Sequence, residues 1–506
     1  MLNRRQLGIQ LDPRRPEPLY RQVFDQVAER VRSGTFPAGY RLPPTRQLAI
    51  ELGAHRNTVV RAYADLESSG FVVSTVGRGT FVARTVADAP LRVPGDRPEL
   101  PWSSLIAPAA LSEPLGRSNR LKRAAMRDDL IHLGRMHPAD DLIPVDLFRR
   151  CVEHVLRTRG ARSLGYTPRE GVPALRALIA DDLARQGVPA LPEDVIVTSG
   201  SQQAIDLVVR ALVSPSDRFL VDALTYPGAM NALAGAGATL CAVANDDEGP
   251  SMASLTRLGP GAKGYYAMPS GHNPTGITMS ARRREALIDW SHQAGFPLVE
   301  DDFSADLSIE DEAPPPALRA LDRQVIYIGS FSKKLIPALR LGFVVAPPAL
   351  QPVLAALKQA LDVGSSALMQ YALAEFLERG YLRAHLGRIL PEYRARRDAL
   401  EAALRLHLPP GIQWRRSVGA LHLWLPLANG YNPEEVADEA RRRGVMVSPS
   451  TLYAVDPREQ PGLRLTFCAE PVARLQEGAR RLGKALSVLA PRRPAALRSH
   501  EQVEMV

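Results

Sequence analysis

The chain has 506 residues, which is too long for one ordinary hydrophobic core and predicts two or more domains. Its 45% apolar and 23% charged residues exclude a disordered or fibrous protein. The sequence starts without the apolar stretch of a signal peptide and contains no run of about 18 apolar residues, so we expect a cytoplasmic protein without a membrane segment.

Positive charge is concentrated near the N-terminus. The whole chain carries a net charge of +9, and residues 1–86 contribute +6 of it through 13 arginines, no lysine and seven acidic residues. Such a region suits a polyanionic partner. The three cysteines, Cys151, Cys241 and Cys468, lie far apart and outside any Cys/His cluster, so we expect buried thiols and no metal site.

The first predicted elements form a compact unit over residues 18–86. Helical spacing of Leu19, Val23, Val27 and Val31 predicts a first helix. A second helix over "PPTRQLAIELG" ends at Gly53, and a third over "HRNTVVRAYADLESSG" ends at Gly70. The stretch "FVVSTVGRGTFVA" then predicts a β-hairpin with a glycine-rich turn. This order of elements is typical of a winged helix-turn-helix that binds DNA.

Residues 18–83 resemble the winged helix-turn-helix of GntR-type bacterial repressors, from "PLYRQ" through "RLPPTRQLAIELG" to "GRGTFV". The resemblance implies a double-stranded DNA operator as partner. By this resemblance, two side chains would hold phosphates, two would reach base edges and one would enter the minor groove. These are, in that order, Arg41 and Thr58, Arg46 and Arg56, and Arg78. The alternative is a basic helical module used only for dimerisation.

Three residues depart from the GntR pattern. Pro44 replaces the usual Ser, and His55 and Asn57 stand where Ser and Thr are usual. These departures lie around the second and third helices, where the reading residues are expected. The resemblance therefore predicts DNA binding but leaves the operator sequence open.

Residues 87–118 are rich in Pro, Ala and Ser, which predicts a linker, and residues 492–506 read as a disordered tail. Between them, residues 128–491 alternate short apolar strands with helices, which predicts a mostly parallel sheet covered by helices on both faces. A long helical stretch over 348–406 precedes a smaller α/β unit over 412–490. The predicted strands are "DVIVTSG", "RFLVDA", "GYYAMPS", "FPLVEDD", "VIYIGSF" and "LGFVVAP".

The stretch "GSFSKKLIPALRLG", residues 329–342, holds two of only six lysines in a chain whose positively charged residues are nearly all arginines. An amine can lose its proton and form an imine with an aldehyde, whereas a guanidinium stays charged. The choice of lysine here therefore points to an aldehyde cofactor such as pyridoxal phosphate (PLP). Such a cofactor also needs a carboxylate for its ring nitrogen, an anion site for its phosphate, and groups that cover and orient the ring.

Each of these needs has a matching residue. Asp301 ends the strand "FPLVEDD", at the edge of an α/β sheet where ligands bind. Asn273 in "SGHNPTG" is a fixed amide donor, and Tyr226 in "TYPG" is a flat ring. The phosphate would be held by a helix start at Gly200, Ser201 and Gln202, together with Ser330 and Arg340.

Residues 128–490 resemble fold-type I aminotransferases through "SGSQQA", "TYPG", "HNPTG", "VEDD" and "SFSKxLxPxLRLG" in the family's order. The resemblance makes Lys333 the Schiff-base lysine and leaves Lys334 without a role. It also makes Arg464 the residue that binds the substrate carboxylate, unless this arginine is a surface residue. Tyr166 would be lent to the phosphate site of a neighbouring subunit. Phe303 stands where such proteins usually carry a Tyr.

The two halves together resemble the MocR family of bacterial regulators. The resemblance implies a homodimer whose DNA binding is switched by an amino compound, or by PLP itself, through the Schiff base at Lys333. This interpretation assigns regulation to the chain and leaves residual transaminase activity of the second domain open. Two alternatives stay open: a true PLP-dependent aminotransferase with a DNA-binding domain, and a DNA-binding protein whose second domain is empty.

Overall fold

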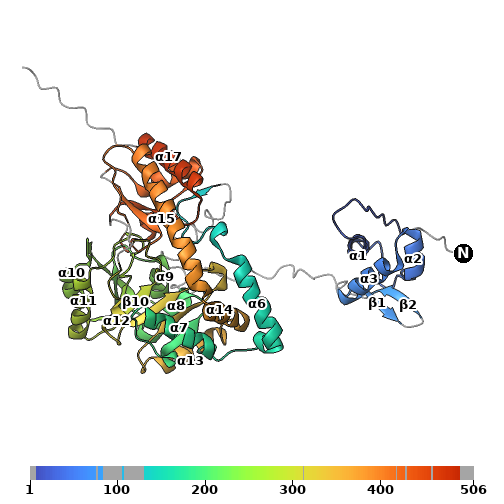
Figure 1. Ribbon diagram of the computed structural model, residues 1–506, viewed down its shortest axis with the longest axis horizontal. Helices are drawn as coiled ribbons and strands as arrows, with labels where there is room; N and C mark the ends of the chain where they lie inside the picture. Colours follow the sequence, from blue (N-terminus) through green and yellow to red (C-terminus); the bar gives the residue numbers. More distant parts are fainter. Residues whose placement is uncertain are drawn as a thin grey trace, which may run out of the picture. The chain divides into compact units, whose positions relative to one another are not determined.

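The structure is a computed structural model that describes residues 7–75, 78–83, 105–106, 130–310, 313–416, 419–427, 430–456 and 460–489. The chain divides into two compact units, Met1–Pro101 and Trp102–Val506, which are described separately (Figure 1). Of the predicted linker, only residues 105–106 are described, and the predicted tail lies outside the described residues.

The first unit contains the predicted elements in the predicted order. Two helices, α1 (Leu19–Arg32) and α2 (Thr45–Glu51), precede α3 (Arg56–Ser68). Strands β1 (Val72–Thr75) and β2 (Gly79–Val82) then pair antiparallel as a hairpin. Gly53 and Gly70 follow α2 and α3 with φ of 62° and 73°, a left-handed conformation that favours glycine. The predicted winged helix-turn-helix is therefore present.

The core of this unit extends N-terminal to the predicted boundary at residue 18. Val23 and Val27 of α1 are fully buried, and Leu7 and Ile9 pack in the same apolar cluster. Gln26 accepts a hydrogen bond from the Gln10 backbone at 3.1 Å and donates one back at 2.7 Å. A short N-terminal arm is thus fixed along α1 by a side chain of that helix.

The second unit is built on a seven-stranded sheet with the order β4-β12-β11-β10-β9-β5-β6. Only β12 runs antiparallel to its neighbours in this sheet, so the prediction of a mostly parallel sheet is confirmed. The strands are β4 (Val195–Thr198), β5 (Arg218–Asp222), β6 (Thr239–Val243), β9 (Ala262–Ala267), β10 (Leu298–Asp302), β11 (Ile326–Ser330) and β12 (Gly342–Val345).

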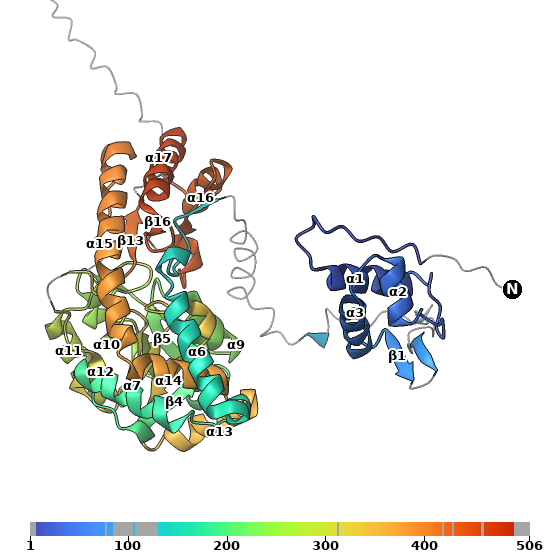
Figure 2. The ribbon, with the colours of Figure 1, turned by 45° about the vertical axis from the view of Figure 1, so that its right-hand side comes forward.

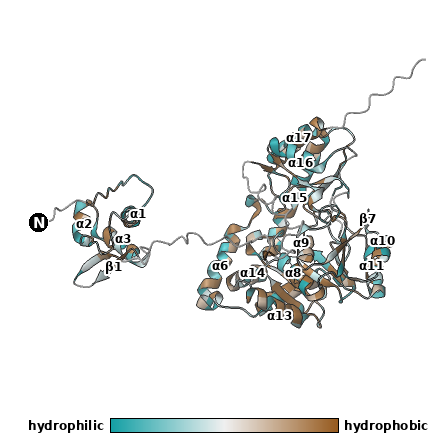
Figure 3. Ribbon diagram, turned by 180° about the vertical axis from the view of Figure 1, so that it is seen from behind, coloured by the Kyte–Doolittle hydropathy of each residue, from teal (hydrophilic) through white to brown (hydrophobic). Residues whose placement is uncertain are grey.

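Helices cover both faces of this sheet because successive strand residues point to opposite sides. Ile196 of β4 packs with residues of α8 (Ser201–Leu212) in one apolar cluster, whereas Val195 and Val197 pack with α7 (Pro173–Arg185) in another. Figure 3 shows that outer helices such as α6 (Val145–Arg159) and α11 (Ala281–Ala294) carry both hydrophobic and hydrophilic residues. The remaining helices of this part are α9 (Pro227–Gly235), α10 (Met252–Leu258), α12 (Leu318–Leu321), α13 (Gln351–Asp362) and α14 (Ala367–Glu378).

A long helix, α15 (Tyr381–His407), connects this part to the smaller predicted α/β part, as Figure 2 shows. There β13 (His422–Pro426), β16 (Gly462–Thr466) and β15 (Ser448–Pro449) form a three-stranded sheet, covered by α17 (Val472–Val488) and α16 (Pro433–Arg442). Strand β14 (Val445–Met446) pairs with β3 (Ile131–His132), so residues 131–132 belong to the smaller part of the second unit. Within the described ranges, no helix combines the length and apolar character needed to cross a membrane.

Candidate functional site

The predicted site residues gather where several strands of the large sheet end. Strands β10 and β11 are parallel, with Asp301 opposite Ile328, so their carboxyl ends meet at one edge. Asp301 is the last but one residue of β10, and Lys333 follows shortly after Ser330, the last residue of β11. In an open α/β sheet this edge is the usual place for a ligand.

Lys333 is half-buried, and its Nζ donates a hydrogen bond to the Met136 carbonyl at 2.5 Å. Burial lowers the pKa of Lys333 from 10.5 to about 8, and the positive charges of Arg464 and Arg340 act in the same direction. The lowered pKa leaves roughly a tenth of the amine neutral near pH 7. A neutral amine is the form that attacks an aldehyde, so this environment suits the predicted chemistry.

Asp301 is buried and only half satisfied. The Tyr266 hydroxyl donates to its Oδ2 at 2.5 Å, whereas its Oδ1 has no hydrogen-bond partner among the described residues. Burial raises the pKa of Asp301 to about 7. An unpartnered, buried carboxylate oxygen is costly unless a ligand donor meets it, and a pyridinium N–H is such a donor. Tyr266 is a site residue that the sequence reading missed.

At the predicted phosphate site, the start of α8 lies close to the start of β12 and to Arg340. Gly200 begins α8 with φ of 90°, and a Cβ there would lie 2.9 Å from Nη2 of Arg340. A Cβ on Gly342, which pairs with Ser330, would lie 2.7 Å from the backbone nitrogen of Ser201. The first N–H groups of a helix have no partner within the helix, so this turn can bind an anion.

Tyr226 and Gln202 lie together at the same edge. A Cβ on Gly228 would overlap with both side chains, and Gln202 donates to the Gly228 carbonyl at 2.9 Å. Burial raises the pKa of Tyr226 to about 12, and the charge of Asp301 adds to the shift. Tyr226 is therefore held as a neutral ring near Asp301, as a stacking residue requires.

Arg464 lies in β16 and is 7% exposed, so the alternative of a surface arginine is wrong. Its Nη1 donates to Asn273 Oδ1 at 2.9 Å and its Nη2 donates to the Gly134 carbonyl at 2.7 Å. Its Nε is buried without a partner among the described residues. Because Asn273 Oδ1 is engaged, the amide nitrogen of Asn273 remains as a donor. Arg464 keeps charge and a free N–H for an anionic group such as a carboxylate.

The residues present fit PLP. A neutralisable amine, a half-satisfied carboxylate, a helix start and a ring occur at one edge of the sheet, as the preceding contacts show. Tyr166 is a predicted site residue whose side chain is 94% exposed and, among the described residues, forms no hydrogen bond or ion pair with this edge. Exposure of a large aromatic to this degree is compatible with its predicted contact to another subunit.

Lys334, to which the resemblance gave no role, is bound in an internal ion pair. Its Nζ lies 2.6 Å from Asp306 and 3.9 Å from Asp182 of α7, and its side chain is 5% exposed. The pair ties the segment after β10 to α7. The two adjacent lysines therefore have separate surroundings.

In the first unit, the predicted reading residues face outward. Arg41, Arg46, Arg56 and Arg78 are exposed, and Thr58 is half-buried on α3. Among the described residues, the side chains of Arg46, Arg56 and Arg78 form no hydrogen bond or ion pair, whereas Arg41 lies over the Phe81 ring at 6.0 Å. His55 caps α3, since its Nδ1 accepts from the Asn57 backbone at 3.3 Å. The unusual His55 thus replaces a cap and not a reading residue.

Comparison with known families matches both units. Residues 144–482 match the family "Aminotransferase class I and II", and residues 19–82 match "Bacterial regulatory proteins, gntR family". The chain is 30% identical to the HTH-type transcriptional regulator YisV of Bacillus subtilis over 91% of its own length and 94% of that protein. It is also 30% identical to MocR of Rhizobium meliloti, described as a probable rhizopine catabolism regulatory protein, over 93% and 94%.

A solved structure shows the fold of the second unit. The α-aminoadipate aminotransferase LysN of Thermus thermophilus, complexed with N-(5'-phosphopyridoxyl)-L-leucine, is 30% identical with a TM-score of 0.72, covering 77% of this chain and 99% of LysN. The matches to whole regulators, and not to enzymes alone, extend through both units. The chain therefore belongs to the MocR-type HTH transcriptional regulators, in which a gntR-family domain is joined to an aminotransferase class I and II domain.

Proposed function

We propose that the protein is a PLP-dependent regulator that binds a DNA operator and senses an amino compound through Lys333. One observation carries this proposal: the same chain holds a site for an aldehyde cofactor and a gntR-family unit with exposed arginines. In the site, the half-buried Lys333 has a lowered pKa, and the nearby Asp301 has one carboxylate oxygen without a partner among the described residues. When bound, the cofactor supplies an aldehyde that exchanges one amine for another.

The chain's own residues would then act as follows. Lys333 would hold the cofactor through its Nζ, and the Met136 carbonyl accepts from that amine when it is free. Asp301 Oδ1 would accept a hydrogen bond from the ring N–H, and the amide nitrogen of Asn273 would donate to the cofactor. Arg464 binds the carboxylate of an incoming amino compound through its free Nε. Phosphate binding falls to Gly200, Ser201, Gln202, Ser330 and Arg340.

Arg464 offers a route from the effector to the smaller part of the second unit. It lies on β16 in that part, whereas Asn273 belongs to the large part, and a hydrogen bond of 2.9 Å joins them. An effector carboxylate that competes for this guanidinium changes how the two parts are held. A ligand shifts such an equilibrium only by its differential affinity for the two states, so the effector must bind one arrangement more tightly. In a variant of this proposal, PLP itself is the effector.

The first experiment is reduction of the PLP-loaded protein with borohydride followed by peptide mapping. We expect the phosphopyridoxyl group on Lys333 and none on the adjacent Lys334, which is committed to Asp306. The unmodified neighbour is an internal control for nonspecific labelling. Label on Lys334, or on neither lysine, would overturn the proposal. In parallel, DNA fragments selected from a random pool by the full chain should be released or retained differently when amino compounds are added.

True transamination is a second candidate function, favoured by the retained Lys333 and by the buried pair of Arg464 and Asn273. The same groups that hold an amino compound for sensing would hold it for proton transfer by the Lys333 amine. Rapid conversion of bound PLP to the pyridoxamine form by a common amino acid favours the enzyme. A stable spectral change without conversion favours the regulator.

A further inference from the structure

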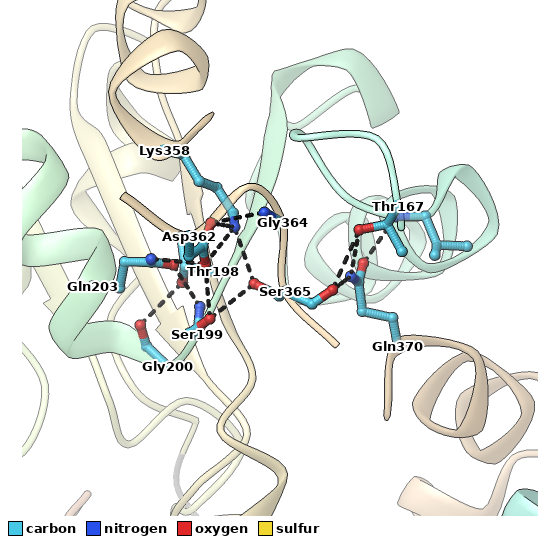
Figure 4. A network of polar contacts seen from close by, with 11 residues as sticks. Thr167, Thr198, Ser199, Gly200, Gln203, Lys358, Asp362, Gly364, Ser365 and Gln370 are labelled. Carbon is cyan, nitrogen blue, oxygen red and sulfur yellow. Dashed lines mark hydrogen bonds and ion pairs between the residues drawn. The ribbon is translucent and has the colours of Figure 1, made fainter. Parts of the chain in front are cut away.

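A network of buried and half-buried polar residues lies beside the turn at the start of α8, as Figure 4 shows. It joins the end of β4 and the first turn of α8 to the end of α13 and the segment that follows it. Its members are Thr198, Ser199, Gln203, Lys358, Asp362, Gly364, Ser365, Gln370 and Thr167.

Asp362 is the centre of this network. Its Oδ2 accepts from the Ser199 hydroxyl at 3.0 Å and from the Gln203 amide at 2.9 Å, which both belong to the turn before and within α8. Its Oδ1 accepts from the Gly364 backbone at 3.0 Å. Lys358 donates to both carboxylate oxygens, at 2.8 and 2.9 Å. Only an ionised carboxylate accepts this many bonds without offering a donor.

Lys358 keeps Asp362 ionised and fixed. Its side chain is fully buried, and its Nζ also donates a hydrogen bond to the Ser365 hydroxyl at 3.1 Å. A buried ammonium is tolerated only when it is paired and fully hydrogen-bonded, so the pair cannot loosen on one side. Although burial opposes it, hydrogen bonds from Lys358 and Gln203 lower the pKa of Asp362 below its ordinary value.

Both backbone polar groups and the side chain of Ser199 are hydrogen-bonded. Its N–H donates to Gln203 Oε1 at 2.7 Å, and its carbonyl accepts from Arg340 Nη2 at 3.3 Å. Its hydroxyl is held by Asp362. The orientation of the Ser199 backbone sets the direction in which the backbone N–H groups of the next residues point. Those next residues are Gly200, Ser201 and Gln202, the predicted phosphate turn.

We propose that Asp362, held by the buried Lys358, is a positioning residue that sets the phosphate turn and thereby the affinity for the phosphate of the cofactor. This inference rests on the proposed function, because it assigns the turn to PLP. Within the described residues, Asp362 is bonded to Ser199 and Gln203 at the start of α8, to Lys358 within α13 and to Gly364 after it. It forms no hydrogen bond or ion pair with Lys333 or Asp301 there. Loss of the Asp362 carboxylate is therefore expected to weaken binding of a cofactor that carries a phosphate, and not of one that lacks it.

The same network also reaches the segment of Tyr166. Thr167 Oγ1 donates to the Ser365 carbonyl at 3.3 Å, and Gln370 Nε2 donates to that carbonyl at 2.9 Å. Asp362 thus fixes the turn that binds phosphate in its own subunit and lies in one hydrogen-bonded network with the residue next to Tyr166.

The test compares PLP with pyridoxal, which has the same aldehyde and ring but no phosphate. Full-length apo protein is titrated with each compound and the absorbance of the bound form gives Kd. For Asp362→Asn we expect the Kd for PLP to rise about tenfold or more, because donors then face an amide N–H₂, while the Kd for pyridoxal changes less than about twofold. Asp206→Asn is the matched control, since Asp206 pairs with Arg210 on the same helix at 2.7 Å but lies outside the network.

Each outcome decides the matter. Equal weakening for both compounds would overturn the inference, since it would show a general structural effect, and an unchanged Kd for PLP would do the same. Ser199→Ala removes one hydroxyl only and keeps the carboxylate paired, so it tests the same link if the Asp362 variant does not fold. We expect it to shift the PLP Kd alone, by a smaller factor. A wild-type protein that takes up neither compound would instead refute the proposed function.

Discussion

Two adjacent lysines have pKa values that move in opposite directions although both lie in enclosed surroundings. Burial lowers the pKa of Lys333, and two arginines add to the effect, whereas Asp306 and Asp182 outweigh burial and raise the pKa of Lys334. The difference follows from which charges each side chain faces and not from exposure. Lys333 is left as a reactive amine, and Lys334 as a permanent cation in an ion pair.

The lowered pKa of Lys333 predicts a pH dependence. Only the neutral amine attacks an aldehyde. As the pH rises, the neutral fraction of Lys333 increases with a midpoint at its folded-state pKa of about 8, instead of at 10.5. The rate at which apo protein captures PLP should therefore rise with pH and level off above a midpoint near that pKa. Stopped-flow absorbance at fixed PLP measures it, with N-acetyl-lysine as the control for ionisation of PLP itself. A midpoint shared by protein and control would show that the site does not tune this amine.

Lys334→Met tests the second lysine. The substitution keeps the aliphatic stem but leaves Asp306 and Asp182 without their shared cation, so the free energy of unfolding should fall by about 2–4 kcal/mol. Denaturant unfolding of the full chain measures the loss, and Lys484→Met, at an exposed lysine, is the control. A loss no larger than in the control would show that the pair is solvent-screened.

At the scale of elements, the sequence predicted what periodicity and turn residues encode. Strand β10, which holds Asp301, and strand β11, which precedes Lys333, lie within the predicted apolar runs "FPLVEDD" and "VIYIGSF". The arm at residues 7–12 was not predicted, although Leu7, Ile9 and Leu11 alternate with Gly8, Gln10 and Asp12. That arm is fixed by side chains of α1 at i and i+4 spacing, Gln22 and Gln26, and pairings of this kind have no signature in one sequence.

The same limit explains which site residues were missed. Tyr266 binds Asp301 from the neighbouring strand β9, and its role depends on the lateral order of the sheet, which the sequence does not state. Asp362 lies 159 residues after Gln203, to which it is hydrogen-bonded. It lies on α13 together with Lys358, and nothing in the sequence of that helix indicates a site. Motifs could be predicted because their residues are neighbours in sequence, whereas support from distant elements could not.

The N-terminal arm yields a prediction at this scale. Gln26→Ala removes both bonds to the Gln10 backbone and should free the arm, with a loss of about 1–2 kcal/mol in the stability of the first unit. Amide hydrogen exchange should show faster exchange at residues 7–12, with the interior of α3 unchanged. Gln47→Ala, which removes an exposed bond to Glu51, is the control. Unaltered protection of the arm would mean that the bonds from Gln22 and Arg30, with the packing of Leu7 and Ile9, fix it without Gln26.

At the scale of the whole molecule, Tyr166 is difficult to explain within one chain. Its side chain is 94% exposed, although the next residue, Thr167, is fixed by the carbonyl of Ser365. A rigid backbone that presents an exposed aromatic ring is typical of a surface that another chain covers. Together with the predicted role at a neighbour's phosphate site, this favours a dimer in which each site is built from two subunits.

Mixed dimers of two defective chains test this directly. We co-express Lys333→Ala and Tyr166→Ala chains with different tags and isolate the heterodimer. If Tyr166 acts on the neighbour, the chain with Tyr166→Ala keeps its own lysine and receives an intact Tyr166 from its partner, so one site of wild-type PLP affinity appears per dimer. If Tyr166 acts within its own chain, no site holds both groups, and the heterodimer binds no better than the parent homodimers. Because each parent lacks one group at every site, recovery cannot come from either variant alone.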